Sequence, residues 1–324
     1  MAIKTSTKGS LLQVRSDAMQ KLLAFGALIL LFIVFSIASP NFFQFDNIVS
    51  IILATCVNGV LALGITFIII TAGIDLSIGT VMTFSAVMTG ILVTNLKLPI
   101  IIGVIGGLIA GALCGFVNGL AVSKMKLPPF IATLGMMQIT KGLSLVLSGT
   151  KPIYFNDTPA FRQISMGNII PGFPNAVLIF AGAAIIASII LTKTVFGRYT
   201  FALGSNEEAT RLSGVKVDSW KIAVYSFGGI CAGLAGVMMA SRLNSAQPAL
   251  GAGYEMDAIS AAVIGGTSLS GGEGTILGTV IGAFIISVLT NGLRILSVPQ
   301  EWQTVVTGVI VIGAVYMDIL RRRK

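Results

Sequence analysis

The chain has 324 residues, of which 55% are apolar and 10% charged, and its mean hydropathy of +0.94 excludes a soluble globular protein and indicates a membrane protein. The net charge of +9 does not indicate a nucleic-acid-binding protein, because the basic residues border apolar stretches and form no stripe with interleaved aromatic residues. Histidine is absent and the three cysteines lie in separate apolar stretches, so the sequence predicts no disulfide, metal site or cofactor.

Apolar stretches of membrane-spanning length divide the whole chain. A bilayer core of about 30 Å requires roughly 20 apolar helical residues. We therefore predict an all-α, polytopic membrane protein with about ten transmembrane helices, in a single domain over 22–320. Nine spans are predicted at 22–38, 48–72, 76–95, 98–122, 129–149, 175–192, 222–240, 275–293 and 302–319, and a tenth, 256–270, is short and broken by Gly265 and Gly266.

The basic residues gather at every second junction between these spans. Because Lys and Arg are enriched in cytoplasmic loops, this pattern predicts that both termini are cytoplasmic, with an N-terminal tail over 1–21 and a basic tail over 321–324. Fifteen of the 21 basic residues fit this arrangement: Lys4, Lys8, Arg15, Lys21, Lys124, Lys126, Lys193, Arg198, Arg211, Lys216, Lys221, Arg321, Arg322, Arg323 and Lys324.

Two halves of the chain resemble each other. Gly73–Ile78 is similar to Gly253–Ile259, and each opens an apolar span; Asn118-Gly119-Leu120 and Asn291-Gly292-Leu293 each follow a glycine-rich span. By the span count the first copy begins at the cytoplasmic side and the second at the external side. The sequence therefore predicts an inverted internal repeat, which is a recurring plan among transporters.

The loop over 193–221 is the longest predicted cytoplasmic connection. Ser205 or Asn206 can cap a short helix whose first turn holds Glu207 and Glu208, and Gly214 can end it. Such a helix either docks into a soluble partner or is a surface helix with a satisfied cap. The residues that we single out for docking are Arg198, Asn206, Glu207, Glu208, Ala209, Arg211 and Gly214.

Several short sequence segments, in this order along the chain, resemble those of the permease subunits of bacterial ABC importers for monosaccharides. They are Ser39–Phe43, Gly73–Gly79, Phe130–Leu134, Gly197–Tyr199, Ala202–Glu207, Ser245–Pro248 and Gly265–Gly272. The resemblance implies an inner-membrane permease for ribose or a relative such as allose, paired with a second copy, a pair of ABC ATPase subunits and a periplasmic sugar-binding protein. The loop over 197–216 would be the ATPase contact, with Thr210 where the family's Glu-Ala-Ala loop has its second alanine.

Polar residues within apolar spans are costly and are therefore candidates for the translocation pathway. Asp75 and Glu255 are either gate residues or acids favoured at a helix N-terminus. Asn58, Gln138 and Gln247 can meet sugar hydroxyls or simply join helices. The full candidate set is Asn58, Asp75, Ser77, Gln138, Gln247, Glu255 and Asp257, and the segments 150–174 and 242–255 are the expected landing surface for the binding protein.

Two other functions compete with an ABC permease. An ion-coupled secondary transporter also fits an inverted repeat, although the chain has no histidine and carries a polar docking loop. An intramembrane enzyme would need a nucleophile with its base or a metal cluster, and the sequence offers no such arrangement. No glycine-rich phosphate loop with Lys-Ser/Thr occurs, so we expect no catalytic residues and ATP hydrolysis by a separate subunit.

Overall fold

The computed structural model describes residues 7–322, and the side chains of residues 22–313 together with Val315 and Tyr316; the ends of the two predicted tails, 1–6 and 323–324, lie outside the described residues. The elements are α1 (Thr7–Ala38), α2 (Phe45–Ile70), α3 (Ile78–Gly90), the π-helical turn η1 (Ile91–Asn95), α4 (Ile100–Ser123), α5 (Pro129–Ser148), β1 (Ile153–Tyr154), α6 (Pro159–Met166), α7 (Asn175–Lys193), α8 (Val195–Ser205), α9 (Glu207–Leu212), α10 (Val217–Leu243), β2 (Ser245–Ala246), α11 (Tyr254–Ile264), α12 (Ile276–Ile295) and α13 (Gln300–Arg322).

Each predicted span contains a helix. In the described part of the chain, seven helices are long and apolar enough to span a membrane: α2, α3 with η1, α4, α5, α7, α10 and α12. The predicted short span at 256–270 contains the helix α11, which ends at Ile264, directly before the predicted break at Gly265 and Gly266. Gly266 has a φ of +95°, which turns the chain out of the helix. The count of ten crossings is thus not established.

Prolines and glycines set many of the helix boundaries. α4 and α7 begin directly after Pro99 and Pro174, and α5 begins at Pro129 after Pro128. Proline suits a helix start because its fixed φ is helical and its missing N–H would have no helical partner. Gly149 ends α5 in the left-handed region, with a φ of +61°.

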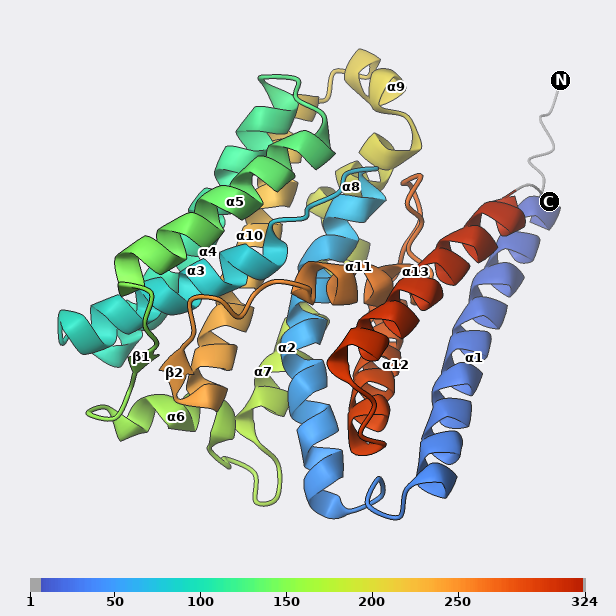
Figure 1. The fold of residues 1–324 in the computed structure, drawn as a ribbon. Coiled ribbons are helices and arrows are strands. Elements are labelled where there is room, and N and C mark those ends of the chain that lie inside the picture. Colours follow the sequence, from blue (N-terminus) through green and yellow to red (C-terminus); the bar gives the residue numbers. More distant parts are fainter. Residues whose placement is uncertain (1–6, 323–324) are drawn as a thin grey trace, which may run out of the picture.

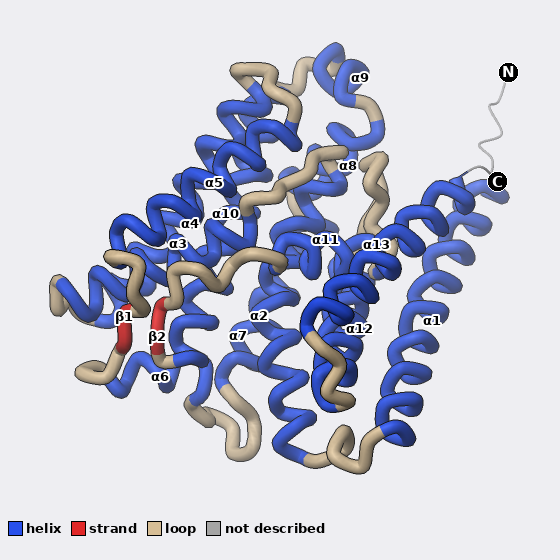
Figure 2. Tube along the Cα trace, in the orientation of Figure 1, coloured by secondary structure: helices blue, strands red, loops and turns tan. Residues whose placement is uncertain are grey.

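The long helices form one bundle with two distinct ends (Figure 1). We call the end that carries α9 the α9 end and the end that carries α6 the α6 end. α1 begins and α13 ends toward the α9 end (Figure 1). The two short strands are the only ones in the described part of the chain, and they lie side by side near α6, with Ile153 opposite Ala246 (Figure 2).

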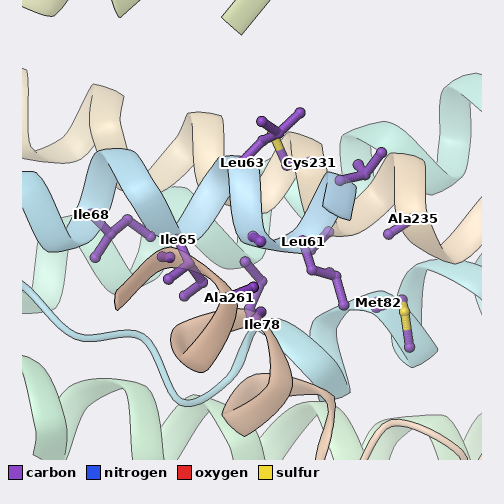
Figure 3. Close-up of a cluster of buried hydrophobic side chains, with 14 of the residues drawn as sticks. Leu61, Leu63, Ile65, Ile68, Ile78, Met82, Cys231, Ala235 and Ala261 are labelled. Atoms are coloured by element: carbon purple, nitrogen blue, oxygen red, sulfur yellow. The ribbon is translucent and has the colours of Figure 1, made fainter. Parts of the chain in front are cut away.

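The centre of the bundle is built around α2 and α10, which run in opposite directions. Gly64 of α2 approaches Gly228 and Cys231 of α10 so closely that a side chain at Gly64 would meet them at 2.9–3.1 Å. Apolar side chains from four helices fill the surrounding core, as Figure 3 shows for Leu61, Ile65 and Ile68 of α2, Ile78 and Met82 of α3, Cys231 and Ala235 of α10, and Ala261 of α11.

The helix contacts come in two matching sets. α10 packs on α3 and α4, and α3 also packs on α5; α2 packs on α11 and α12, and α11 also packs on α13. The matching helices run in opposite directions: α4 runs toward the α9 end and α12 toward the α6 end (Figure 1). This paired packing is the arrangement that the inverted repeat predicts.

Glycine lets α4 and α10 approach each other closely. Gly111 of α4 lies against Gly229 and Gly233 of α10, and Gly115 lies against the backbone of Tyr225. Between membrane helices, close approach adds dispersion contacts that lipid would otherwise provide, and small residues permit it. The glycine-rich spans noted in the sequence therefore serve this packing.

Candidate coupling surface and translocation segments

The predicted docking loop folds into two helices, α8 and α9. The Asn206 side chain accepts a hydrogen bond of 2.9 Å from the backbone N–H of Ala209, so Asn206, and not Ser205, caps α9. Ser213 follows α9, and Gly214 has a φ of +84°, as expected for a glycine that ends a helix. The short capped helix is confirmed, whereas α8 was not predicted.

The buried side of α9 rests on α8. The Thr210 hydroxyl is buried and lies 3.0 Å from the carbonyl oxygen of Ala202 in α8 and 2.8 Å from that of Asn206. The Ala202 contact joins α9 to α8, whereas the Asn206 contact lies within α9 itself. Thr210 is the position where the sequence departs from the family's second alanine, and its hydroxyl makes a contact that alanine cannot make.

Glu207 ties α9 to itself and to α10. Its carboxylate pairs with Arg211 one turn later, at 3.1 Å, and with Lys221 of α10. Burial alone would raise the pKa of the Glu207 carboxyl, but the hydrogen bonds and positive charges of Lys221 and Arg211 hold that pKa below its ordinary value. Glu207 is therefore ionised at neutral pH and holds α9 against α10.

A second carboxylate, Asp218, links this segment to a distant turn. Asp218 lies in the first turn of α10 and pairs with Lys126 at 3.1 Å, Lys124 at 3.5 Å and Arg211 at 3.7 Å. Lys124 and Lys126 belong to the turn between α4 and α5. The contact with Lys126 could not be predicted from local sequence, because Lys126 and Asp218 are 92 residues apart.

The outer side of α9 is open. Glu208, Ala209 and Arg211 are exposed, and the Leu212 side chain is 84% exposed although it is apolar. Sequence analysis missed Leu212. Its position does carry a signal, because residues two apart on a helix lie about 200° apart, so Leu212 must face away from the buried Thr210.

α3 begins inside the bundle after an irregular segment, 71–77. The Ser77 hydroxyl donates to Asp75 Oδ1 at 2.6 Å, the Ser77 backbone N–H donates to the same oxygen at 2.8 Å, and Asn118 Nδ2 donates to the Ser77 hydroxyl at 2.9 Å. The Leu76 backbone N–H donates to the Thr133 hydroxyl at 3.2 Å. Two candidates, Asp75 and Ser77, thus share one buried network that fixes the start of α3.

α11 begins against the start of α3. Both carboxylate oxygens of Glu255 lie 3.1 Å from the Gly253 backbone N–H, and the carboxylate also faces Gly79 in the first turn of α3. Gly79 and Gly251 are in backbone contact, since a side chain on either would overlap the carbonyl oxygen of the other. The two discontinuous helices of the repeat therefore meet near their N-termini.

The remaining pathway candidates do not form one site. Gln247 donates to the Ser245 hydroxyl at 3.0 Å and lines a small pocket with Thr83 at the α6 end. Gln138 lies on the exposed side of α5, and Asp257 is half-buried on α11. Asn58 is half-buried on α2, and its Oδ1 has no hydrogen-bond partner among the described residues. No hydrogen bond links these four side chains in the described part of the chain.

The two predicted landing segments do come together at the α6 end. β1 of 150–174 pairs with β2 of 242–255. The Phe155 backbone N–H donates to the Asn244 carbonyl at 3.2 Å, and the Ser165 backbone N–H donates to the Ser241 hydroxyl at 2.9 Å. These bonds join the two segments to each other and hold α6 against the end of α10.

Comparison with known proteins gives the family. Residues 47–315 match the family described as branched-chain amino acid transport system / permease component. The chain belongs to this permease family. The permease is 43% identical over 302 residues to the ribose import permease protein RbsC of Bacillus subtilis, covering 93% of each chain. No solved structure gives a significant match.

Other relatives of the permease are named as transport proteins for ribose or D-allose. It is 41% identical over 295 residues to the ribose import permease protein RbsC of Escherichia coli K12, covering 90% of this chain and 91% of that one. It is also 38% identical over 288 residues to the D-allose transport system permease protein AlsC of the same strain, covering 89% and 88%. The permease is therefore a polytopic helical transport component of the bacterial inner membrane.

Proposed function

We propose that the permease is the membrane subunit of an ATP-driven ABC importer that carries a pentose or a related monosaccharide, with D-ribose as the first candidate. The names of its relatives, ribose and D-allose import proteins, support the sugar. The observation that carries the ATP-driven mechanism is the α8–α9 unit, a capped and ion-paired helix standing out from one end of the bundle.

The α9 end is the proposed cytoplasmic side. Lys124, Lys126, Arg211, Lys216 and Lys221 all lie at this end, near α9 or in the turn beside it. Positive side chains are retained on the cytoplasmic side of bacterial membranes. α1 begins and α13 ends toward the same end (Figure 1), which supports cytoplasmic termini.

The α6 end is then the periplasmic side, where a sugar-binding protein delivers its cargo. The paired segments β1 and β2, with α6 beside them, form the proposed landing surface. Gln247 and Thr83 line the pocket directly at this end. Neutral amide and hydroxyl groups suit a neutral sugar, because they exchange hydrogen bonds with it without burying a charge.

A second copy of the permease is the proposed neighbour of α5. The exposed side of α5 carries Gln138, with Gly135 and Gly142 about one turn to either side, and a side chain at either glycine would meet nothing within 4 Å. A polar amide in the middle of a span is costly toward lipid, and small residues permit close helix contact. This face therefore suits a polar path between two copies.

In this mechanism ATP closes a pair of ATPase subunits, which move the α8–α9 units. Each unit rests on the last turn of α2 and on the loop before α12, because Gly204 of α8 lies against the Ile70 carbonyl and the Gly272 backbone N–H. The Gly272 N–H donates to the Ile70 carbonyl at 2.8 Å. Movement of α8 therefore reaches the segment between α2 and α3 and the segment between α11 and α12. These segments adjoin the two discontinuous helices, α3 and α11.

The test is uptake of radiolabelled D-ribose by cells that lack their own ribose-type permease but retain its ATPase and binding protein. Glu208→Arg reverses an exposed charge on α9, and Gly214→Pro cannot adopt the φ of +84°. We expect both variants to abolish uptake while reaching the membrane in normal amounts. Thr192→Arg, an exposed change on α7 at the same end, is the matched control and should transport normally.

Uptake that survives both α9 variants but collapses when an ionophore dissipates ion gradients would support an ion-coupled carrier instead. That outcome would leave the family assignment unchanged, because the family rests on sequence similarity. It would remove the ATPase contact from the function of α9.

A further inference from the structure

The turn between α4 and α5, residues 124–128, lies at the same end of the bundle as α9 (Figure 1). Met125 in this turn is 67% exposed, and Leu212 on α9 is 84% exposed. Both are large apolar side chains outside the apolar spans. Apolar side chains of this size, exposed at the same polar end of a protein, indicate a contact surface.

Asp218 is the group that joins these two segments. Its Oδ1 lies 3.1 Å from Lys126 Nζ and 3.7 Å from the Arg211 guanidinium, and its Oδ2 lies 3.5 Å from Lys124 Nζ. Arg211 adjoins Leu212 in the chain, and the two lysines flank Met125. One carboxylate therefore sits between the positive groups that border both apolar side chains.

Without Asp218 these positive groups would repel one another. Each pair is partly solvent-exposed, and such pairs contribute little to folding stability individually. The Asp218 carboxylate pairs with two lysines of the α4–α5 turn and with Arg211 of α9. It therefore sets the distance between the turn and α9. Its expected effect is on the shape of the surface more than on the stability of the fold.

We propose that Asp218 is a positioning residue that holds α9 and the α4–α5 turn together as one docking surface for the ATPase subunit, with Leu212 and Met125 as its two apolar contacts. The proposal rests on the proposed function and extends its contact beyond α9. Lys124, Lys126 and Arg211 form a positive rim around the two apolar side chains. The matching surface on the ATPase would have two apolar depressions bordered by acidic side chains.

A charge swap tests the positioning role. The affinity of the detergent-purified permease for its ATPase subunit is measured for the unchanged chain, Asp218→Lys, Lys126→Asp and the double variant. We expect Asp218→Lys to weaken binding at least tenfold and Lys126→Asp to weaken it less because Lys124 remains. The double variant should bind at least threefold more tightly than Asp218→Lys, because the ion pair is restored although the Lys126 charge of the rim is lost. Equal thermal unfolding midpoints and gel-filtration profiles would show that folding is intact.

An apolar substitution tests the extended surface separately. Met125→Ser removes the apolar side chain without adding a charge beside Lys124 and Lys126, and should weaken ATPase binding at least fivefold. The matched control is Ile169→Ser, which changes a 77% exposed apolar side chain at the α6 end and should leave the affinity unchanged.

The outcomes separate this proposal from the proposed function. If Glu208→Arg and Leu212→Asp weaken ATPase binding while the Met125 and Asp218 variants do not, α9 alone is the contact and the composite surface is wrong. If the double variant stays as weak as Asp218→Lys, the positioning role of the ion pair is wrong. If none of the variants changes binding, the ATPase contact itself fails.

Discussion

Gly79 of α3 and Gly251, just before α11, are in backbone contact at the centre of the permease, and neither position has room for a side chain. The contact joins the two discontinuous helices of the inverted repeat near their N-termini. It lies beside the Glu255 carboxylate, which faces the first turn of α3. The two halves of the molecule are thus held together where each discontinuous helix begins.

We expect Gly79→Ala to disrupt this contact, because the added methyl group would overlap a backbone carbonyl that cannot rotate away. Overpacking of this kind typically costs about 1–3 kcal/mol. The thermal unfolding midpoint in detergent should fall, and D-ribose uptake should fall with it. Gly182→Ala on α7, where the methyl group would meet nothing within 4 Å, is the matched control. A Gly79→Ala protein as stable and active as the control would contradict the contact.

Substitutions of Asp75 distinguish a gate from a helix-start acid. Asp75→Asn keeps an oxygen that can accept the Ser77 N–H, whereas Asp75→Ala removes it. If the carboxyl mainly fixes the start of α3, the Asn variant should transport within about threefold of the unchanged chain. Removing the acceptor leaves the buried Ser77 donors without this partner, which costs roughly 1–3 kcal/mol, so the Ala variant should be less stable. Equal loss of uptake in both variants, at normal stability, would show that the charge itself is needed.

The ion pairs of Glu207 predict a pH dependence. The pKa of this carboxyl is lower in the folded permease than in the unfolded chain, where glutamate titrates near about 4.3. Its contribution to stability is therefore present above that value and is lost as the pH falls through the folded pKa. Glu207→Gln should lower the unfolding midpoint by about 1–2 °C at pH 7, since an exposed pair is worth at most about 1 kcal/mol.

The readout is the difference in unfolding midpoint between the unchanged chain and Glu207→Gln, measured from pH 7 downward. The difference should shrink toward zero as the unchanged carboxylate becomes protonated. A difference that stays constant below about pH 4 would mean that Glu207 acts through packing and not through its charge.

Thr210 provides a test of the link between α8 and α9. Thr210→Val keeps the buried volume but removes the hydroxyl that reaches the Ala202 and Asn206 carbonyls. We expect reduced coupling, measured as less D-ribose imported per ATP hydrolysed by the assembled transporter. Thr210→Ser, which keeps the hydroxyl, should restore the ratio. An unchanged ratio in Thr210→Val would show that α8 and α9 need no such bond.

Local features of α9 were predictable from the sequence, because helix caps depend on neighbouring residues. Asn206, Glu207 and Gly214 have the roles at the helix ends that their residue types favour. α8 was missed because Arg198, Gly204 and neighbouring polar residues gave the segment the composition of a loop, although Thr194 accepts a hydrogen bond from the Gly197 N–H at its start.

Long-range contacts could not be predicted in the same way. Nothing local indicates that Asp218 meets Lys126, or that Asn118 reaches Ser77 from another helix. The span predicted at 76–95 was correct in extent, but the buried network at its start depends on tertiary packing. The predicted similarity between Gly73–Ile78 and Gly253–Ile259 located the neighbouring segments without revealing that Gly79 and Gly251 touch.

The most direct test of the account is D-ribose uptake by proteoliposomes that contain the permease and its ATPase subunit. D-ribose and the binding protein are placed on one side of the membrane and ATP on the other. We predict uptake that requires ATP and the binding protein, fails with a non-hydrolysable ATP analogue, and persists when an ionophore removes ion gradients. Uptake that proceeds without ATP and stops with the ionophore would contradict the central claim that α9 couples this permease to an ATPase.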